Sequence, residues 1–226
     1  MNGSSKSFVR VFVFGVLCLA LTAGGALADT QSDKDKAAAA AKQTAQTPPA
    51  MDAAMQAQMA EMVKLGTPGK PHEQLKAMEG TWNADVKSWM GPGEPTVSKG
   101  TMVNKMILGG RFLESRYSGK FLDQTFDGVG LTGYDNKKNE IITLWLDSMG
   151  TSWMMQNGKW SADGKEIQVS GTADGFDGKP TTFTSTTKVV DNNKHVYTMS
   201  TMMGGKDTPV MEITYTRASG TTAAGQ

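Results

Sequence analysis

The turn signals in the C-terminal part of the chain constrain the fold more than any other feature. Between Thr81 and Arg217, nine clusters of turn-forming residues recur at short intervals and separate ten segments of roughly eight to twelve residues. Many of these segments alternate polar and apolar residues, and no helical period lies between them. The pattern predicts an all-β antiparallel meander rather than βαβ units. The clusters are GPGEP, LGG, GKFLD, DNKKN, SMG, ADG, DGFDGKP, DNNK and GGKD.

The last two segments have faces of mixed polarity. Alternation places Met211, Ile213, Tyr215 and Arg217 on one face of the final segment. The preceding segment likewise puts Tyr197 on a face with methionine and threonine. A barrel with a partly polar lumen fits this mixture better than a two-layer sandwich. We therefore expect an antiparallel barrel of about ten strands within residues 71–217, preceded by one or two short helices and followed by a flexible tail at 218–226.

The N-terminus has the order of a secretory signal. Lys6 and Arg10 precede an apolar run from Val11 to Leu21, and small residues then end in Ala26-Leu27-Ala28. This run is far shorter than the ~20 residues of a membrane-spanning helix. We expect residues 1–28 to be a cleaved signal peptide, which predicts a periplasmic or secreted protein with no transmembrane segment after cleavage. Cleavage also removes Cys18, so that a disulfide-free core must hold the fold together.

Two segments separate the predicted signal from the barrel. Residues 29–50 contain mainly Ala, Lys, Gln, Thr and Asp, which predicts a disordered linker. Residues 51–66 follow with methionines at spacings of four, four and three, which puts them on one face of an amphipathic helix. A second short helix is expected from His72 to Met78, after Pro71. The methionines of the first helix are Met51, Met55, Met59 and Met62.

The charge balance argues against nucleic acid as a partner. The whole chain has 23 Lys and Arg against 22 Asp and Glu, and loss of Lys6 and Arg10 leaves a net charge of −1. No cluster of basic residues is interleaved with aromatic residues, as a nucleic-acid surface would require.

Gly80-Thr81-Trp82 at the first strand and Arg217 at the last resemble the closed end of lipocalins and other calycins. The resemblance implies that Trp82 covers that end and that Arg217 stacks across it, as structural closure. A guanidinium over an indole would contribute about 1–2 kcal/mol and join the first strand to the last. In the alternative interpretation, Trp82 is an ordinary core aromatic and Arg217 an exposed strand end.

Five separated strings resemble the bacterial family called domain of unknown function 1579. This resemblance implies a secreted or periplasmic lipocalin-like barrel without an assigned activity. The strings are Trp89-Met90-Gly91-Pro92-Gly93, Leu108-Gly109-Gly110-Arg111-Phe112-Leu113, Gly133-Tyr134-Asp135-Asn136, Trp145-Leu146-Asp147-Ser148-Met149-Gly150 and Ile213-Thr214-Tyr215-Thr216-Arg217.

Candidate ligand-binding residues are polar or aromatic side chains on the strands and in the family-like strings. Each has an alternative structural role in a turn, an outer ion pair or the core. The lumen candidates are Arg111, Glu114, Arg116, Tyr134, Trp145, Asp147, Tyr197 and Tyr215. The stretch 128–133 also fits G-x-G-x-x-G, but a hairpin signal follows it, so we expect Gly128 and Gly130 to relieve crowding in a strand instead.

No residues are expected to be catalytic or to bind a metal, and no cofactor is predicted. His72 and His195 lack a second His or Cys at ligand spacing, and we expect both to be exposed. A heme ligated by His195 is a minor alternative, by analogy with small heme barrels. Of the 16 methionines, 15 follow Met1, and Cu(I) binding by their thioethers is a second minor alternative to flexible packing.

The leading hypothesis is a non-catalytic barrel that binds a small, largely apolar molecule in its lumen, with the methionine helix packed on the barrel or over its mouth. One alternative is an envelope enzyme that uses Asp147 or Glu114 as acid or base. Another is an interaction module that recognises an envelope protein partner through the methionine-rich helix.

Overall fold

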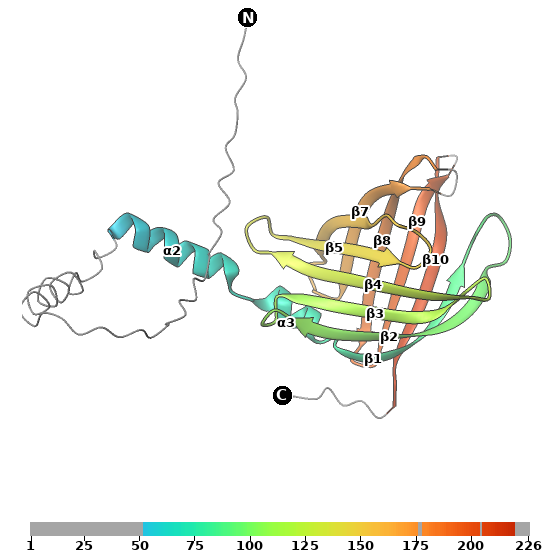
Figure 1. Cartoon of the computed structure of the whole chain (residues 1–226), viewed down its shortest axis with the longest axis horizontal. Coiled ribbons are helices and arrows are strands. Elements are labelled where there is room, and N and C mark those ends of the chain that lie inside the picture. Colours follow the sequence, from blue (N-terminus) through green and yellow to red (C-terminus); the bar gives the residue numbers. More distant parts are fainter. Residues whose placement is uncertain (1–51, 176–177, 204, 220–226) are drawn as a thin grey trace, which may run out of the picture. The chain divides into compact units, whose positions relative to one another are not determined.

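A computed structural model describes residues 52–175, 178–203 and 205–219, and Figure 1 shows the chain. The predicted signal peptide (1–28), the predicted linker (29–50), Met51 and residues 220–226 of the predicted tail lie outside the described residues. Two helices and ten strands follow in the described part. They are α2 (Ala53–Gly66), α3 (Lys70–Lys76), β1 (Gly80–Ser88), β2 (Thr96–Ile107), β3 (Phe112–Phe121), β4 (Gln124–Asp135), β5 (Glu140–Asp147), β6 (Met154–Trp160), β7 (Glu166–Asp174), β8 (Pro180–Asp191), β9 (Lys194–Met203) and β10 (Lys206–Arg217).

The ten strands form one closed antiparallel barrel. Each strand pairs with the next along the chain, and β1 pairs with β10 to close the sheet. The nine predicted turn clusters lie at the nine connections between consecutive strands. The fold class predicted from the sequence is therefore confirmed, because short connections between alternating segments leave each strand beside its neighbour in sequence.

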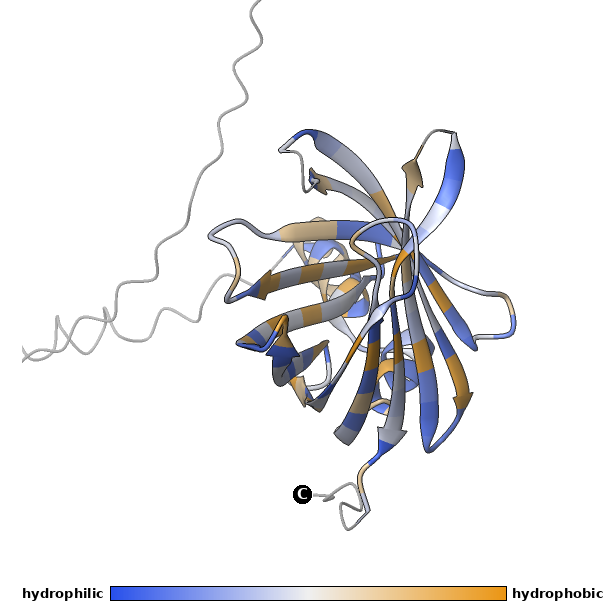
Figure 2. Cartoon of the chain, turned by 90° about the vertical axis from the view of Figure 1, so that its right-hand side faces the viewer, coloured by the Kyte–Doolittle hydropathy of each residue, from blue (hydrophilic) through white to orange (hydrophobic). Residues whose placement is uncertain are grey.

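Side chains along each strand alternate between the barrel interior and its outer surface, and Figure 2 shows the alternation of hydropathy along the ribbons. In β1, Trp82, Ala84 and Val86 are buried, whereas Asn83 and Asp85 between them are exposed. This period of two follows from the pleat of a β-strand. It gives the barrel an interior that is mainly apolar and an outer face that is mainly polar.

The short helix α3 closes one end of the barrel. Leu75 is fully buried and Met78, just after the helix, is nearly so. Both pack in a cluster with Leu113, Ile141 and Ile167 from three different strands. The amide of Gln74 also donates to the carbonyl of Gly164 at 3.2 Å, in the turn between β6 and β7. Apolar side chains from α3 thus fill the end of the barrel at which β1 begins.

The helix α2 differs from the expectation of a packed methionine helix. No residue of α2 is buried, and Met59 and Met62 are 47% and 70% exposed. Asn136, in the turn between β4 and β5, donates to the carbonyls of Leu65 and Thr67 at 2.8 and 2.9 Å. That turn lies at the closed end of the barrel. Met55, Met59 and Met62 therefore do not form part of the core. The C-terminal end of α2 is hydrogen-bonded to the closed end of the barrel, opposite the mouth.

Candidate functional site

The closed end of the barrel is built on the contact expected between Trp82 and Arg217. The two residues are paired across β1 and β10, and the guanidinium carbon lies 4.1 Å from the centre of the indole ring. Gly80 permits this arrangement, because it has a φ of +120° and an added Cβ there would come within 2.5 Å of Arg217 Nη1. The glycine of the Gly-x-Trp string is thus required by the position of the arginine.

The carbonyl groups of the turn between α3 and β1 are satisfied by this same closure. Arg217 donates from Nη1 to Glu79 O at 2.6 Å and from Nη2 to Ala77 O at 3.3 Å. The Trp82 indole N–H and the Asn104 amide both donate to Met78 O at 3.0 Å. These hydrogen bonds satisfy backbone carbonyls that would otherwise be left unpaired in a closed-off turn, and they join that turn to the barrel.

Both histidines are buried, so the expectation that they are exposed is wrong. His72 Nδ1 accepts a hydrogen bond from Gly69 N at 3.0 Å, and its ring meets that of Tyr134 edge-on. His195 packs between the indole of Trp82, with ring centres 4.3 Å apart, and the phenol of Tyr215, at 4.6 Å. Burial lowers the pKa of His195 to about 4, with a further contribution from the positive charge of Arg217. The imidazole is therefore neutral at physiological pH and acts as part of the aromatic core.

A cavity of about 700 Å³ occupies the lumen above this closed end. Side chains from all ten strands line it, and Leu75 and Met78 contribute to its wall at the α3 end. At the opposite end, Met90, Met149 and Trp153 line it and are 51%, 57% and 64% exposed. These three residues belong to the loops after β1 and β5, so they form an apolar rim at the mouth. The volume lies in the usual range of small-molecule pockets, about 300–1,000 Å³.

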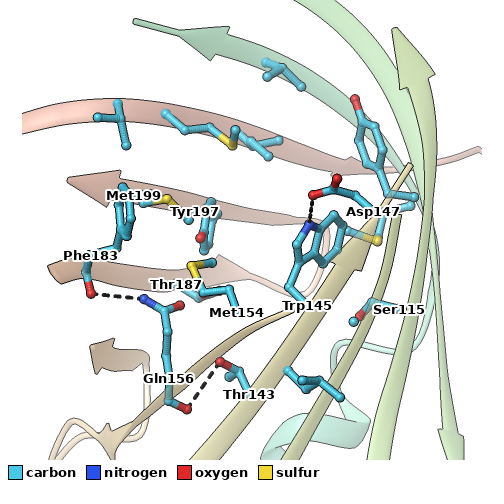
Figure 3. A pocket seen from close by; sticks show the side chains of 18 of the residues that line it. Ser115, Thr143, Trp145, Asp147, Met154, Gln156, Phe183, Thr187, Tyr197 and Met199 are labelled. Atoms are coloured by element: carbon cyan, nitrogen blue, oxygen red, sulfur yellow. Dashed lines mark hydrogen bonds between the residues drawn. The ribbon is translucent and has the colours of Figure 1, made fainter. Parts of the chain in front are cut away.

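Trp145 forms a fixed aromatic platform inside the cavity. On β5 it is paired with Gly130 of β4, and its ring covers both Gly128 and Gly130: an added Cβ would overlap the ring at Gly128 and would lie 3.2 Å from it at Gly130. Its indole N–H donates to Asp147 Oδ2 at 2.9 Å, as Figure 3 shows. Asp147 Oδ1 accepts from the backbone of Met149 at 2.9 Å. The glycines therefore do relieve crowding, and what they accommodate is the indole.

Tyr197 and Tyr215, two further lumen candidates, also line the cavity. The Tyr197 hydroxyl lies 3.0 Å from Ser185 Oγ, and burial raises the pKa of Tyr197 to about 12. Burial raises the pKa of Tyr215 as well. Both phenols therefore stay protonated and neutral, and they add hydroxyl groups rather than charge to the wall. Trp145, Asp147, Tyr197 and Tyr215 are thus brought together in one cavity.

The other four candidates do not line this cavity. Glu114 and Arg116 lie on the outer face of β3 and bond to each other at 2.7 Å, whereas Leu113, Ser115 and Tyr117 on the same strand face inward. The expectation that these two residues line the lumen is therefore wrong. A shift of one residue along a strand exchanges its two faces, and the residue pattern of this strand does not fix that choice.

Arg111 and Tyr134 occupy structural positions instead. Arg111 lies in the turn between β2 and β3, where its guanidinium donates to Leu108 O at 3.1 Å. Tyr134 is partly buried and packs with the cluster around Leu75, beside His72. Both residues stabilise the closed end and its turns, and neither is among the residues that line the cavity.

A set of uncharged polar residues in the cavity wall was missed by the sequence analysis. One comes from each of the strands β2 to β6, and all five line the cavity. They could have been found from the period of two along each strand, if one residue of that strand, as Trp82 is for β1, had already been assigned to the interior. Without the pairing register, a serine or threonine at such a position looks like an outer-face residue. We call these residues the polar belt: Asn104, Ser115, Thr132, Thr143 and Gln156.

Within the described residues, no group of three or more His, Cys, Asp or Glu side chains is placed to hold a metal ion. The helices in this part of the chain are also too short or too polar to cross a membrane. Asp147 and Glu114, the two carboxylates considered for catalysis, do not converge, because one lies in the cavity and the other on the outer surface.

The closed ten-stranded barrel, the helix at its end and the Trp82–Arg217 closure define a lipocalin-like protein. The profile of the family described as "Protein of unknown function (DUF1579)" matches residues 67–217, and the chain belongs to this family. Among solved structures, the chain is similar to the crystal structure of Rv2717c from M. tuberculosis, with 13% sequence identity and a TM-score of 0.51. That match covers 67% of this chain and 99% of the other, and it shows a shared fold. No curated protein matches the chain in sequence.

Proposed function

We propose that this protein is a non-catalytic barrel of the periplasm or the extracellular medium that binds a small, largely apolar molecule in its lumen. The observation that carries the proposal is the cavity of about 700 Å³, with a mainly apolar wall and an indole platform held flat over two glycines. An aromatic ring fixed in advance loses little conformational freedom when a ligand packs on it. The predicted signal peptide at 1–28 supports the compartment.

The arrangement of acidic groups favours binding over catalysis. Asp147 accepts hydrogen bonds from the Trp145 indole and from the backbone of Met149, and among the described residues no histidine or second carboxylate is bonded to it. Acid–base catalysis is typically carried out by titratable groups whose environments set their pKa values apart, and no such pair is formed here. Glu114, the other acidic candidate, faces away from the cavity and pairs with Arg116.

The test is native mass spectrometry of the full chain purified from the envelope of its own host. We expect a bound small molecule in the wild type and in Ser118→Phe, which alters the outer face of β3. Ser115→Phe, on the inner face of the same strand, fills the cavity and should abolish the complex. If wild-type protein carries no small molecule and does not bind the neutral apolar dye Nile red, the proposed function is wrong.

A second candidate function is recognition of an envelope protein through the exposed face of α2. It is favoured by the absence of any buried residue in this helix and by the exposure of Met55, Met59 and Met62. Exposed methionines adapt to varied apolar partners. Deletion of residues 29–66 should abolish capture of the partner while Nile red binding by the barrel persists. Equal capture by the deleted and full-length chains would exclude this role for α2.

A further inference from the structure

The polar belt has a defined place in the cavity wall. Asn104 pairs with Ser115 across β2 and β3, and Thr143 pairs with both Thr132 and Gln156. The two groups are offset by two residues, because Ser115 pairs with Gly130 rather than with Thr132. Figure 3 shows Ser115, Thr143 and Gln156 on the wall near Trp145. The mainly apolar lumen thus contains a strip of uncharged hydrogen-bonding groups on five neighbouring strands.

Asn104 leaves one hydrogen-bond acceptor of this belt unmatched. Its side chain is buried, at 6% exposure, and its amide nitrogen is committed to the carbonyl of Met78. That carbonyl fixes the orientation of the amide, because the reversed amide would place two oxygens against each other. Asn104 is among the residues that line the cavity, and its Oδ1 is a buried acceptor with no hydrogen-bond partner among the described protein groups. An unmatched buried acceptor costs about 1–3 kcal/mol, which a donor on the ligand would offset.

The charges around the cavity oppose an anionic ligand head placed at this belt. Of the described residues that line the cavity, Lys120 is the one lysine or arginine, and it lies exposed near the open end of β3. His195, at the closed end, is neutral at physiological pH. Two carboxylates also line the cavity, Asp147 beside Trp145 and Asp174 at the end of β7. A carboxylate buried at the belt would have no cation to compensate its lost hydration.

We propose that the lumen selects uncharged amphipathic molecules that carry a hydroxyl group over carboxylates of the same size. The hydroxyl hydrogen is donated to Asn104 Oδ1 after a small movement of the neighbouring side chains uncovers this buried oxygen, and the apolar part packs on the Trp145 indole and on the apolar wall. This inference rests on the proposed ligand-binding function and adds the chemical class of the ligand. An alcohol should bind more tightly than its methyl ether, because only the alcohol can donate a hydrogen bond to Asn104 Oδ1. It should also bind more tightly than the corresponding carboxylate, because no lysine or arginine among the described residues lies at the polar belt to pair with the negative charge.

The test compares three probes of equal chain length on wild-type protein: dodecanol, dodecyl methyl ether and dodecanoate, each competing with Nile red above neutral pH. We expect dodecanol to bind about tenfold more tightly than either of the others, since one matched hydrogen bond contributes about 1 to 1.5 kcal/mol. This comparison needs no variant, so it is independent of any effect of mutation on folding.

Two variants locate the effect. Asn104→Leu should lose about tenfold in dodecanol affinity and leave the ether unchanged, while circular dichroism checks that the barrel is folded. Ser118→Phe, which alters the outer face of β3, should leave dodecanol binding unchanged. If dodecanoate binds at least as tightly as dodecanol, and Lys120→Met weakens it, the ligand head lies at the mouth and the inference is wrong. Equal affinity for alcohol and ether also overturns it, while the proposed function stands. If none of the probes displaces Nile red and the wild type carries no small molecule, the proposed function itself fails.

Discussion

The two ends of the barrel differ in how deeply their tryptophans are buried. At the closed end, Trp82 is 1% exposed, and its ring, its N–H and the guanidinium of Arg217 all have partners. At the open end, Trp153 is 64% exposed on a loop that lines the cavity. The same residue type thus closes one end and borders the other. Stability is concentrated where side chains are buried and bonded, and the open end stays accessible to a ligand.

The largest expected effect separates the two tryptophans. Trp82→Ala should lower the free energy of unfolding by about 3–5 kcal/mol, because it leaves a cavity beneath Arg217 and removes the bond to Met78. Trp153→Ala should change it by no more than about 0.5 kcal/mol. Urea denaturation followed by circular dichroism measures both. Similar losses for the two variants would contradict the contrast between the ends.

A pH titration of stability sharpens the same comparison. The pKa of His195 is about 4 in the folded protein and 6.5 when unperturbed. Above pH 6.5 the ring is neutral in both states; as the pH falls from 6.5 towards 4, only the unfolded state gains the proton. The unfolding free energy should therefore fall by on the order of 3 kcal/mol over this window and level off below it.

His195→Phe is the control for this titration, because it keeps an aromatic ring between Trp82 and Tyr215 and removes the titrating group. Most of the slope should disappear in this variant. A smaller slope in the same direction remains from His72, whose pKa burial also lowers. An unchanged slope in this variant would mean that groups other than His195 cause the pH dependence.

In the middle of the barrel, Gly128→Ala should displace the Trp145 indole from the wall. The added methyl group would overlap the ring, so we expect a loss of about 1–3 kcal/mol in stability together with weaker Nile red binding. Gly150→Ala is the matched control in a loop at the mouth, where the nearest atoms to an added Cβ are 4.0 Å away. Intrinsic fluorescence and urea denaturation of the two variants should differ clearly.

The smallest effect is expected on the outer wall. Glu114→Gln breaks the pair with Arg116, whose side chain is 63% exposed, and should change stability by less than about 0.5 kcal/mol. Nile red affinity should be unchanged as well, in contrast to Ser115→Phe on the inner face of the same strand. A clear loss of dye binding in Glu114→Gln would place this carboxylate at the cavity after all.

The sequence predicted the features that depend on local chemistry. Turn clusters gave the strand connections, and Gly80, Trp82 and Arg217 indicated the closed end, because the glycine and the aromatic–cation pair have specific geometric requirements. The face of β3 was misjudged, since Phe112 and Leu113 are both apolar and neither fixes the register. The burial of His195 depends on rings from β1 and β10, and no local pattern around it shows those contacts.

The bonds from Arg217 to Glu79 and Ala77 join residues separated by 138 and 140 positions. Hairpins of consecutive strands can form from residues that are close in sequence, but the closed end of the barrel cannot form without the last strand. Contacts so distant in sequence form late, because the intervening polypeptide must first be brought together. We therefore expect the contacts of the Arg217 guanidinium to form last in folding, and a chain that ends before Arg217 cannot make them.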